Sequence, residues 1–306
     1  EFVPHDNVLR YEEFIRLAKL FAKQGIRKIK VTGGEPLVRH GCQDFIRDLK
    51  SIDGIDNVTL TTNGVLLDRY LPDLLDAGVV AIAELAEKVA ETLDTMQKDK
   101  YFRITGRDEF DQVWRGIQNT MAAGMKVKLN CVPIGGVNDD EIADFFELAR
   151  KNPIDVRFIE MMPIGFGKIL PVDPKSKVLE TLQERYGRYE RIMQRKRKAD
   201  SQEKYGYGPA VYYRFSDLDI SIGLIQAIHG KFCDRCNRVR ITSEAKLKPC
   251  LASAKVIDLR PALEDTENPD KLAELMRQAI FQKPKSHHFE EQNSKKSSET
   301  MNQIGG

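Results

Sequence analysis

The 306-residue sequence has no long apolar run and no block of charge of one sign. A membrane-spanning helix needs about 20 consecutive apolar residues, and no stretch approaches that length. The first residues, EFVPHDNVLR, resemble neither a signal peptide nor a transit peptide. With a formal net charge of +2, the chain also lacks a nucleic-acid-binding arm. These absences argue against membrane and nucleic-acid partners and predict an intracellular protein, in the cytoplasm or the mitochondrial matrix.

Cysteine is also scarce. The chain has five, an odd number that argues against a disulfide framework. Cys42 and Cys131 are scattered and are adequately explained as small buried apolar residues. The other three, Cys233, Cys236 and Cys250, follow the pattern C-x2-C-x13-C. Such clustering points to metal chemistry.

What is present, up to about residue 160, is an alternation of helical and extended patterns. In residues 9–25 the apolar Phe14, Leu17 and Phe21 follow helical spacing, and Gly25 supplies a stop. The whole alternation predicts an α/β fold with parallel strands joined by right-handed crossovers, in which the loops after the strands hold the chemistry. The predicted strands are 26–31, 57–62, 79–83, 126–132 and 154–160, and the predicted helices between them are 45–52, 66–78, 110–124 and 141–152.

Past residue 165 the alternation ends. A helix near 174–186 precedes a charged stretch that is typical of a solvated loop, and the extended runs 210–215 and 220–225 are shorter. We therefore expect two domains, 1–165 and 166–306. The second is a smaller α+β module that carries the clustered cysteines.

The segments RVRIT and KLKPC are both strand-like, and a hairpin turning near Ser243 and Glu244 would bring Cys250 back beside Cys236. Structural zinc requires four ligands, and His229 is the nearby candidate for the fourth. One interpretation is therefore a zinc site with three thiolates and His229. The other is an iron–sulfur cluster with one open iron, where an outside ligand binds.

Two arginines follow the second clustered cysteine. On a strand, Arg238, Arg240 and Thr242 share one face, and Val239 and Ile241 share the other. Arginine offers planar, bidentate donors suited to phosphate, so the pair could clamp an anion. A solvated strand face with ordinary surface arginines explains the same pattern. Beside an incompletely ligated metal, we favour the clamp.

The loops TGGEP (32–36) and TTNG (61–64) are weak signals by themselves. TGGEP lacks the spacing of a dinucleotide fingerprint and of a P-loop. Its two glycines let backbone approach a ligand, and its glutamate could hold an amine or hydroxyl, but a tight turn has the same composition. TTNG is typical of a turn first and of a ligand loop second.

Taken together and in order, the motifs are specific. The chain resembles the GTP 3′,8-cyclases of molybdenum-cofactor biosynthesis, which are radical S-adenosylmethionine (SAM) enzymes, in the motifs TGGEP, TTNG, LDT, ITGR, VKLN, GVNDDE, VRFIEMMP, FCDRCNRVRIT, LKPCL and a terminal IGG. The resemblance covers nearly all of the chain. It implies an incomplete, TIM-like (β/α)6 radical SAM barrel over 1–165 and a small C-terminal α+β iron–sulfur module over 166–306, which binds GTP and ends in a Gly-Gly tail.

The resemblance also implies a reaction. In that family one [4Fe–4S] cluster cleaves SAM to a 5′-deoxyadenosyl radical, which abstracts hydrogen from C3′ of GTP and starts closure onto C8 of the purine. The product is (8S)-3′,8-cyclo-7,8-dihydroguanosine 5′-triphosphate, on the way to molybdopterin. A second [4Fe–4S] cluster holds the GTP base at its unique iron. The implied partners are GTP, the downstream cyclic pyranopterin monophosphate synthase and a second copy of the chain.

Carried over motif by motif, the resemblance assigns residues to three sites and to the tail. Arg157 and Asn63 are second-tier candidates, for which a structural role fits equally well. The first-tier residues are Cys233, Cys236 and Cys250 for the second cluster, Lys30, Thr61, Lys128, Arg238 and Arg240 for GTP, Gly34, Met162 and Thr92 for SAM, and Gly305 and Gly306 for a tail that reaches the active site.

The sequence departs from the family pattern in two places. The C-x3-C-x2-C signature that ligates the SAM cluster occurs nowhere in it, and the resemblance would place that signature, with the first barrel strand, before Glu1. We therefore expect an N-terminally truncated member that binds GTP and cannot cleave SAM. Residues 78–95 are longer than the family's and rich in Ala, Glu and Lys, which predicts helix and puts Thr92 in the place of a serine.

Two other functions stay open. A non-catalytic protein would hold zinc or an iron–sulfur cluster with the same cysteines, and metal analysis separates it from a cyclase. Another radical SAM enzyme with an auxiliary cluster would share TGGEP, but it would not explain Arg238, Arg240 and the IGG ending together.

Overall fold

The computed structural model groups the chain into two compact units. Unit 1 comprises Glu1–Thr61, Arg69–Val80 and Asn237–Gly306, and unit 2 comprises Thr62–Asp68 and Ala81–Cys236. The structure describes residues 4–79, 81–84, 94–162, 176–192, 208–230, 232–253, 255–265 and 268–287. Within these ranges, no helix is both long and apolar enough to cross a membrane.

Unit 2 is built on one sheet of parallel and antiparallel strands. The parallel strands, in order, are β3 (Ala81–Glu84), β4 (Lys126–Cys131), β5 (Ile154–Ile159) and β8 (Ile220–Ile225). The antiparallel strands β7 (Val211–Phe215) and β6 (Glu190–Arg191) follow β8 at the edge of the sheet. The strands predicted over 79–83, 126–132 and 154–160 are confirmed, and so is their parallel direction.

The runs 210–215 and 220–225 were expected in the C-terminal module, and this part of the prediction is wrong. β8 pairs with β5, so both runs belong to the sheet of unit 2. The physical reason lies in their alternation: Ile220, Ile222 and Leu224 are buried in the same apolar core as the side chains of β4 and β5.

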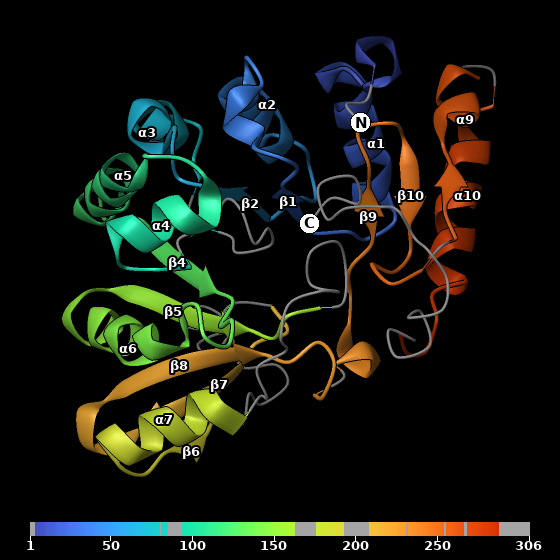
Figure 1. The fold of residues 1–306 in the computed structure, drawn as a ribbon. Coiled ribbons are helices and arrows are strands. Elements are labelled where there is room, and N and C mark those ends of the chain that lie inside the picture. Colours follow the sequence, from blue (N-terminus) through green and yellow to red (C-terminus); the bar gives the residue numbers. More distant parts are fainter. Residues whose placement is uncertain are drawn as a thin grey trace. The chain divides into compact units, whose positions relative to one another are not determined.

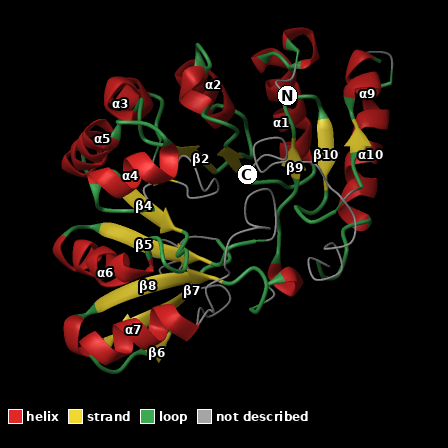
Figure 2. Cartoon of the chain, in the orientation of Figure 1, coloured by secondary structure: helices red, strands yellow, loops and turns green. Residues whose placement is uncertain are grey.

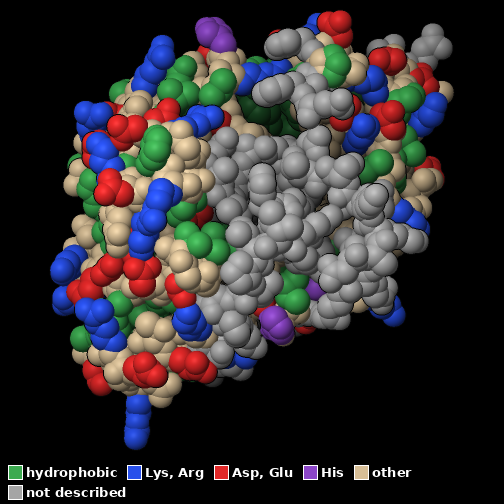
Figure 3. Space-filling view, in the orientation of Figure 1, with side chains coloured by type: hydrophobic (Ala, Val, Ile, Leu, Met, Phe, Trp, Pro, Cys, Tyr) green, Lys and Arg blue, Asp and Glu red, His purple; other side chains and the backbone are tan. Residues whose placement is uncertain are grey.

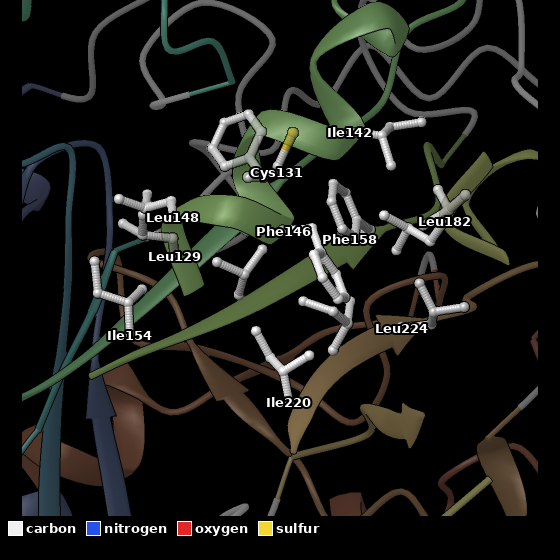
Figure 4. Close-up of a cluster of buried hydrophobic side chains, with 14 of the residues drawn as sticks. Leu129, Cys131, Ile142, Phe146, Leu148, Ile154, Phe158, Leu182, Ile220 and Leu224 are labelled. Carbon is white, nitrogen blue, oxygen red and sulfur yellow. The ribbon is translucent and has the colours of Figure 1, made fainter. Parts of the chain in front are cut away.

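The helices of unit 2 bury one face of its sheet. They are α4 (Lys98–Thr105), α5 (Phe110–Ala122), α6 (Ile142–Lys151) and α7 (Ser176–Tyr186). Leu129 and Phe158 pack with Phe146 of α6 and Leu182 of α7 in one core, which Figure 4 shows in close-up. Fully burying each such side chain contributes about 1.5–3 kcal/mol. Since alternate residues of a strand point to opposite faces, the polar residues of β4 and β5 lie on the other face.

Unit 1 contains the first helix–strand repeats. β1 (Lys28–Val31) runs parallel to β2 (Asn57–Thr62), and the unit also holds α1 (Tyr11–Lys23), α2 (Cys42–Lys50) and most of α3 (Leu67–Asp76). The predicted helical face is confirmed, because Leu17 and Phe21 are buried. The predicted stop is confirmed as well: α1 ends at Lys23, and Gly25 has a φ of 89° that suits glycine.

The C-terminal part of unit 1 is a small antiparallel sheet against helices. β9 (Arg240–Ile241), β10 (Lys246–Lys248) and β11 (Ile257–Asp258) form the sheet, and α9 (Arg260–Glu264) and α10 (Pro269–Phe281) follow. Figure 2 shows β10 beside α10, and their side chains share a core with α1. The predicted hairpin is confirmed. Its register pairs Arg240 with Lys248, so the turn is centred on Glu244.

Side chains of both charges are interspersed over the described surface in Figure 3, as the small net charge suggests. Figure 1 traces the elements along the chain. The sequence analysis missed α4, α9 and α10. Of the segment 78–95, β3 and residues 94–95 are described, so the helix expected there lies mostly outside the described residues.

Candidate functional site

A row of polar side chains crosses the face of the unit 2 sheet opposite to its apolar core. The register places Lys128 of β4 beside Asp155 of β5. Two residues further along β5, Arg157 lies beside Gly223 of β8, which in turn lies beside Tyr212 of β7. The strand order thus brings two sequence-predicted residues, Lys128 and Arg157, to one place.

Asp155 is the centre of a hydrogen-bonded group. Its Oδ2 accepts one bond of 2.7 Å from Nη2 of Arg157 and another of 2.8 Å from the hydroxyl of Tyr212. Nε of Arg157 donates to the same hydroxyl at 2.9 Å. Nζ of Lys128 lies 3.8 Å from Oδ2 of Asp155. We call Lys128, Asp155, Arg157 and Tyr212 the Asp155 cluster.

Gly223 makes room for this contact. A Cβ added at Gly223 would lie 2.9 Å from Cγ of Arg157 and 3.2 Å from Cε1 of Tyr212. Both distances are shorter than ordinary van der Waals contact between carbons. Only a residue without a side chain lets Arg157 and Tyr212 meet across β8. Asp155, Tyr212 and Gly223 were all missed by the sequence analysis, where the isolated glycine in ISIGLI was the one available signal.

The charges of the Asp155 cluster are interdependent. Burial, together with the charge of Arg157, lowers the pKa of Lys128 to about 8, although Asp155 acts in the opposite direction. Burial also acts to lower the pKa of Arg157, but Asp155 and Tyr212 more than offset it, so its pKa lies above the usual value. The pKa of Tyr212 is raised, chiefly by burial. At neutral pH two cations therefore face one carboxylate, and the surplus positive charge favours an anionic ligand.

Toward the carboxyl ends of the strands, side chains near this row become apolar. A small cluster of buried residues there consists of Val132, Ile134, Ile159 and Met161. Met162, the candidate SAM contact, follows directly and is half-buried. Apolar surface beside a few polar groups is typical of small-molecule sites.

A buried network joins the motifs LDT and GVNDDE. Glu141 is 0% exposed, and its carboxylate accepts bonds from the hydroxyl of Thr95 at 2.7 and 2.9 Å and from the backbone N–H of Met96 at 2.6 Å. Nζ of Lys100 lies 2.9 Å from the same carboxylate. GVNDDE therefore contributes a buried anchor for the chain that follows LDT.

Asp94 of LDT is anchored to the end of β4. Its Oδ1 accepts a bond of 2.8 Å from the backbone N–H of Val132, and its carbonyl oxygen accepts one of 2.7 Å from Nδ2 of Asn138. Burial raises the pKa of Asp94 to about 7, although the bond from Val132 acts to lower it. Thr92, the doubtful SAM contact, lies outside the described residues, as do Gly305 and Gly306.

Cys233 and Cys236 lie on one short turn of unit 2. The 3-10 turn Cys233–Arg235 is closed by a bond of 3.2 Å from N of Cys236 to the carbonyl of Cys233. Both side chains are half-buried, whereas Cys42 and Cys131 are buried, as predicted. Cys250, also half-buried, belongs to unit 1 and follows β10.

His229, the fourth ligand of the zinc interpretation, is engaged by a carboxylate. Glu160 is 3% exposed at its side chain; its Oε1 contacts Nδ1 of His229, and its Oε2 accepts bonds of 2.8 and 3.1 Å from the backbone N–H groups of Ile228 and His229. Glu160 thereby fixes the loop before the C-x2-C turn. Within the described ranges, no group of three or more His, Cys, Asp or Glu side chains is arranged to hold a metal ion.

In unit 1, the predicted ligand loops combine turn chemistry with one buried hydroxyl. Oε1 of Glu35 accepts a bond of 2.9 Å from N of Leu37, so the glutamate of TGGEP caps a short helix. A Cβ added at Gly34 would meet no atom within 4 Å, which leaves its backbone open to a ligand. Thr61 of β2 is buried, and its hydroxyl has no hydrogen-bond partner among the described residues. Lys30 of β1 is exposed.

Asn63, at the start of unit 2, supports the structural interpretation, because its Oδ1 accepts a bond of 3.0 Å from N of Val65. In unit 1 the predicted arginine face is half-buried. Arg238 and Arg240 are each partly covered, and the carbonyl of Arg238 accepts a bond of 2.8 Å from Nζ of Lys283.

Opposite Arg240 lies Lys248, which is 1% exposed and adds a third cation that the sequence analysis did not select. Val239 and Ile241 pack into the apolar core, as predicted. Thr242 instead accepts bonds from N of Glu244 and N of Lys246 inside the turn.

Two family models match consecutive parts of the chain. The first, described as "Radical SAM superfamily", matches residues 1–149, and the second, described as "Molybdenum Cofactor Synthesis C", matches residues 154–289. Among solved structures, SuiB of Streptococcus suis bound to the precursor peptide SuiA aligns with a TM-score of 0.52 at 14% identity, over 84% of this chain and 58% of that protein. This likeness concerns the fold alone. The fold class is thus α/β, and residues 1–149 are similar to the radical SAM superfamily.

Comparison with curated relatives identifies the family within this fold class. A "GTP 3′,8-cyclase" of Heliobacterium modesticaldum is 41% identical over 99% of this chain and 89% of its own length. Another from Alkaliphilus oremlandii is 40% identical over 99% of this chain and 88% of its own length. The chain belongs to the GTP 3′,8-cyclase family, which confirms the resemblance inferred from its motifs.

Proposed function

We propose that the protein is a GTP 3′,8-cyclase of molybdenum-cofactor biosynthesis, which converts GTP to (8S)-3′,8-cyclo-7,8-dihydroguanosine 5′-triphosphate. The observation that carries this proposal is the 41% identity to an enzyme of that name over 99% of this chain. The sequence similarity to that enzyme extends over both the N-terminal and the C-terminal half of this chain, as expected if residues of both halves contribute to the same site. An incomplete (β/α)6 barrel followed by a C-terminal iron–sulfur module belongs to the same proposal, supported by the parallel β3, β4, β5 and β8.

Three thiols would hold the second [4Fe–4S] cluster, those of Cys233, Cys236 and Cys250. The donor chemistry fits, because thiolates are the usual ligands of iron–sulfur clusters and these cysteines are half-buried rather than enclosed in apolar cores. Three protein ligands would leave one iron for an outside ligand, which we assign to the GTP base. Glu160 would contribute by fixing the loop that precedes Cys233.

Gly34 and Met162 would contact SAM, and Thr92 would be a third contact. The open backbone at Gly34 supports this role, because a ligand can approach it closely. SAM with a reduced [4Fe–4S] cluster would supply the 5′-deoxyadenosyl radical that removes hydrogen from the substrate, but the C-x3-C-x2-C ligands of that cluster do not occur in this sequence. The buried anchors at Asp94 and Glu141 would hold the chain that follows the Thr92 segment.

GTP would be held by cations and one hydroxyl. A buried hydroxyl left without a partner costs about 1–3 kcal/mol, so a ligand that engages Thr61 recovers that loss. Lys128, beside Arg157, would meet the phosphates, and Arg238 and Arg240 are assigned to GTP by the family resemblance. Lys30 completes the set, although it is exposed. The terminal Gly305 and Gly306 would reach the same site.

The test is nucleotide affinity of the anaerobically reconstituted chain. Lys128→Met should weaken GTP binding on the order of tenfold or more, because it removes a charge-assisted contact. Lys151→Met, at an exposed lysine of α6, is the matched control and should leave affinity unchanged. ATP should bind more weakly than GTP. Equal affinity for ATP and GTP, or equal behaviour of the two variants, would overturn the proposal.

The alternative of a non-catalytic zinc protein is not favoured. The curated relatives from Heliobacterium modesticaldum and Alkaliphilus oremlandii are both named GTP 3′,8-cyclase, an enzyme. We extend the proposal to two partners, a cyclic pyranopterin monophosphate synthase that takes the product onward and a second copy of this chain.

A further inference from the structure

The Asp155 cluster contains two groups that no family motif assigned. Asp155 and Tyr212 are 57 positions apart in the sequence, yet their side chains share a hydrogen bond of 2.8 Å. Between them they hold Arg157 at two of its nitrogens, Nε and Nη2. Among the described residues, no hydrogen bond engages the third nitrogen, Nη1. That nitrogen therefore stays available as a donor to a ligand.

We propose that Asp155 and Tyr212 are positioning residues, which hold Arg157 and Lys128 as a pair of cations for one phosphate group of the nucleotide. The proposal rests on the GTP binding proposed above and names the part of the chain that organises it. Without Asp155, two positive charges would face each other on adjacent strands. Without the hydroxyl of Tyr212, the guanidinium would lose one of its two anchors and would have to be ordered when the ligand binds.

Gly223 supports the same interpretation. Its missing side chain is what allows Arg157 to reach Tyr212 across β8. Glycine in the interior of a strand normally weakens that strand. At Gly223 this loss of strand stability is accompanied by the hydrogen bond between Arg157 and Tyr212, which a larger residue would prevent. Tyr212 is 1% exposed. A buried phenol with two charged partners is well suited to fixing a geometry.

The cluster also predicts proton uptake. Lys128 has a pKa lowered to about 8, and the groups that act on it are Asp155 and Arg157 on β5 and Lys126 on its own strand, while Tyr212 on β7 stays neutral. A bound phosphate favours the charged ammonium. Above about pH 8, binding must therefore transfer a proton from the buffer to Nζ of Lys128, and affinity must fall as the pH rises.

The experiment is calorimetric titration of the reconstituted chain with GTP, guanosine and SAM, in buffers of different ionisation enthalpy, below and above about pH 8. GTP should take up nearly one proton at alkaline pH. Guanosine, which lacks phosphate, should take up none. Lys128→Arg should keep its affinity at neutral pH and lose the alkaline decline, because a guanidinium does not titrate there.

Variants of the positioning residues complete the test. Tyr212→Phe should weaken GTP binding about three- to tenfold without moving the pH at which affinity declines, as expected for one lost hydrogen bond. Asp155→Asn should move that decline to lower pH, because Lys128 loses the charge that raises its pKa. The controls are Tyr213→Phe, on the other face of β7, and Asp217→Asn, which is exposed.

Folding of each variant is checked by circular dichroism and thermal unfolding. If Asp155→Asn does not fold, Tyr212→Phe and Lys128→Arg still decide the question. A Tyr212→Phe chain that binds GTP like Tyr213→Phe would overturn the role of the positioning residues, as would proton uptake with SAM and not with GTP. A wild-type chain that does not bind GTP would instead overturn the proposed function itself.

Discussion

Replacing Gly223 by alanine should destabilise unit 2, because the site is packed against a fixed arginine. The new Cβ would lie 2.9 Å from Cγ of Arg157, which belongs to the stem of the side chain and not to its mobile end. Arg157 cannot move aside without breaking bonds of 2.7 and 2.9 Å to Asp155 and Tyr212. Overpacking of this kind costs about 1–3 kcal/mol.

The loss of conformational freedom in the unfolded chain acts in the opposite direction and is smaller than the cost of overpacking. Alanine restricts the unfolded chain more than glycine does, which stabilises the folded state by about 0.4–1 kcal/mol where the backbone is compatible. We therefore expect Gly223→Ala to lower the free energy of unfolding by about 1–2 kcal/mol. The assay is urea unfolding followed by circular dichroism, with the midpoint and slope compared with the wild type.

Gly135→Ala provides the control, since an added Cβ at Gly135 meets no atom within 4 Å. Its free energy of unfolding should stay within about 0.5 kcal/mol of the wild type. If Gly223→Ala proved as stable as the wild type or more stable, the close contact of Arg157 and Tyr212 across β8 would be wrong.

Three further predictions concern buried groups. Glu141→Ala should lower the free energy of unfolding by about 3–5 kcal/mol, because it leaves Lys100 without a buried partner. Asp140→Ala, at an exposed partner of the same lysine, should lower it by less than about 1 kcal/mol. Urea unfolding of both variants checks this. The pKa of Asp94 is raised from 3.8 to about 7, so its contribution to stability is present below about pH 4 and is lost as the pH rises through 7. Unfolding midpoints should then decline over that window relative to Asp94→Asn, and parallel pH profiles would contradict the buried site. Thiol labelling of the native metal-free chain, followed by mass spectrometry, should modify Cys233, Cys236 and Cys250 and spare Cys42 and Cys131, whose pKa values are raised by burial.

Local periodicity predicted those parts of the fold whose contacts are local or repeat regularly. The spacing of Leu17 and Phe21 determines which face of α1 is buried, and alternation along β4 and β5 determines which face of the sheet is polar. Lys128 was selected because VKLN resembles a family motif, and the alternation of β4 then places it on the polar face. The hairpin was found because RVRIT and KLKPC flank a short turn.

The rest depended on contacts far apart in the sequence. Tyr212 meets Asp155 only because β8 lies between β5 and β7, an order that no local pattern encodes. Glu160 reaches the backbone of His229 from 69 positions away, a contact that the local sequence does not indicate. Strands 210–225 were placed in the wrong part of the fold for the same reason, since their partner β5 is distant in sequence.

Cys233, Cys236 and Cys250 should hold a cluster with one iron open to GTP. Iron and sulfide analysis of the anaerobically reconstituted chain, with electron paramagnetic resonance of the reduced sample, tests it most directly. We predict about four iron atoms per chain and a spectrum that GTP changes and ATP does not. Cys236→Ser should lose the cluster, and Cys42→Ser, at a buried cysteine, should keep it. Stoichiometric zinc without iron, or a cluster whose spectrum ignores GTP, would contradict the account.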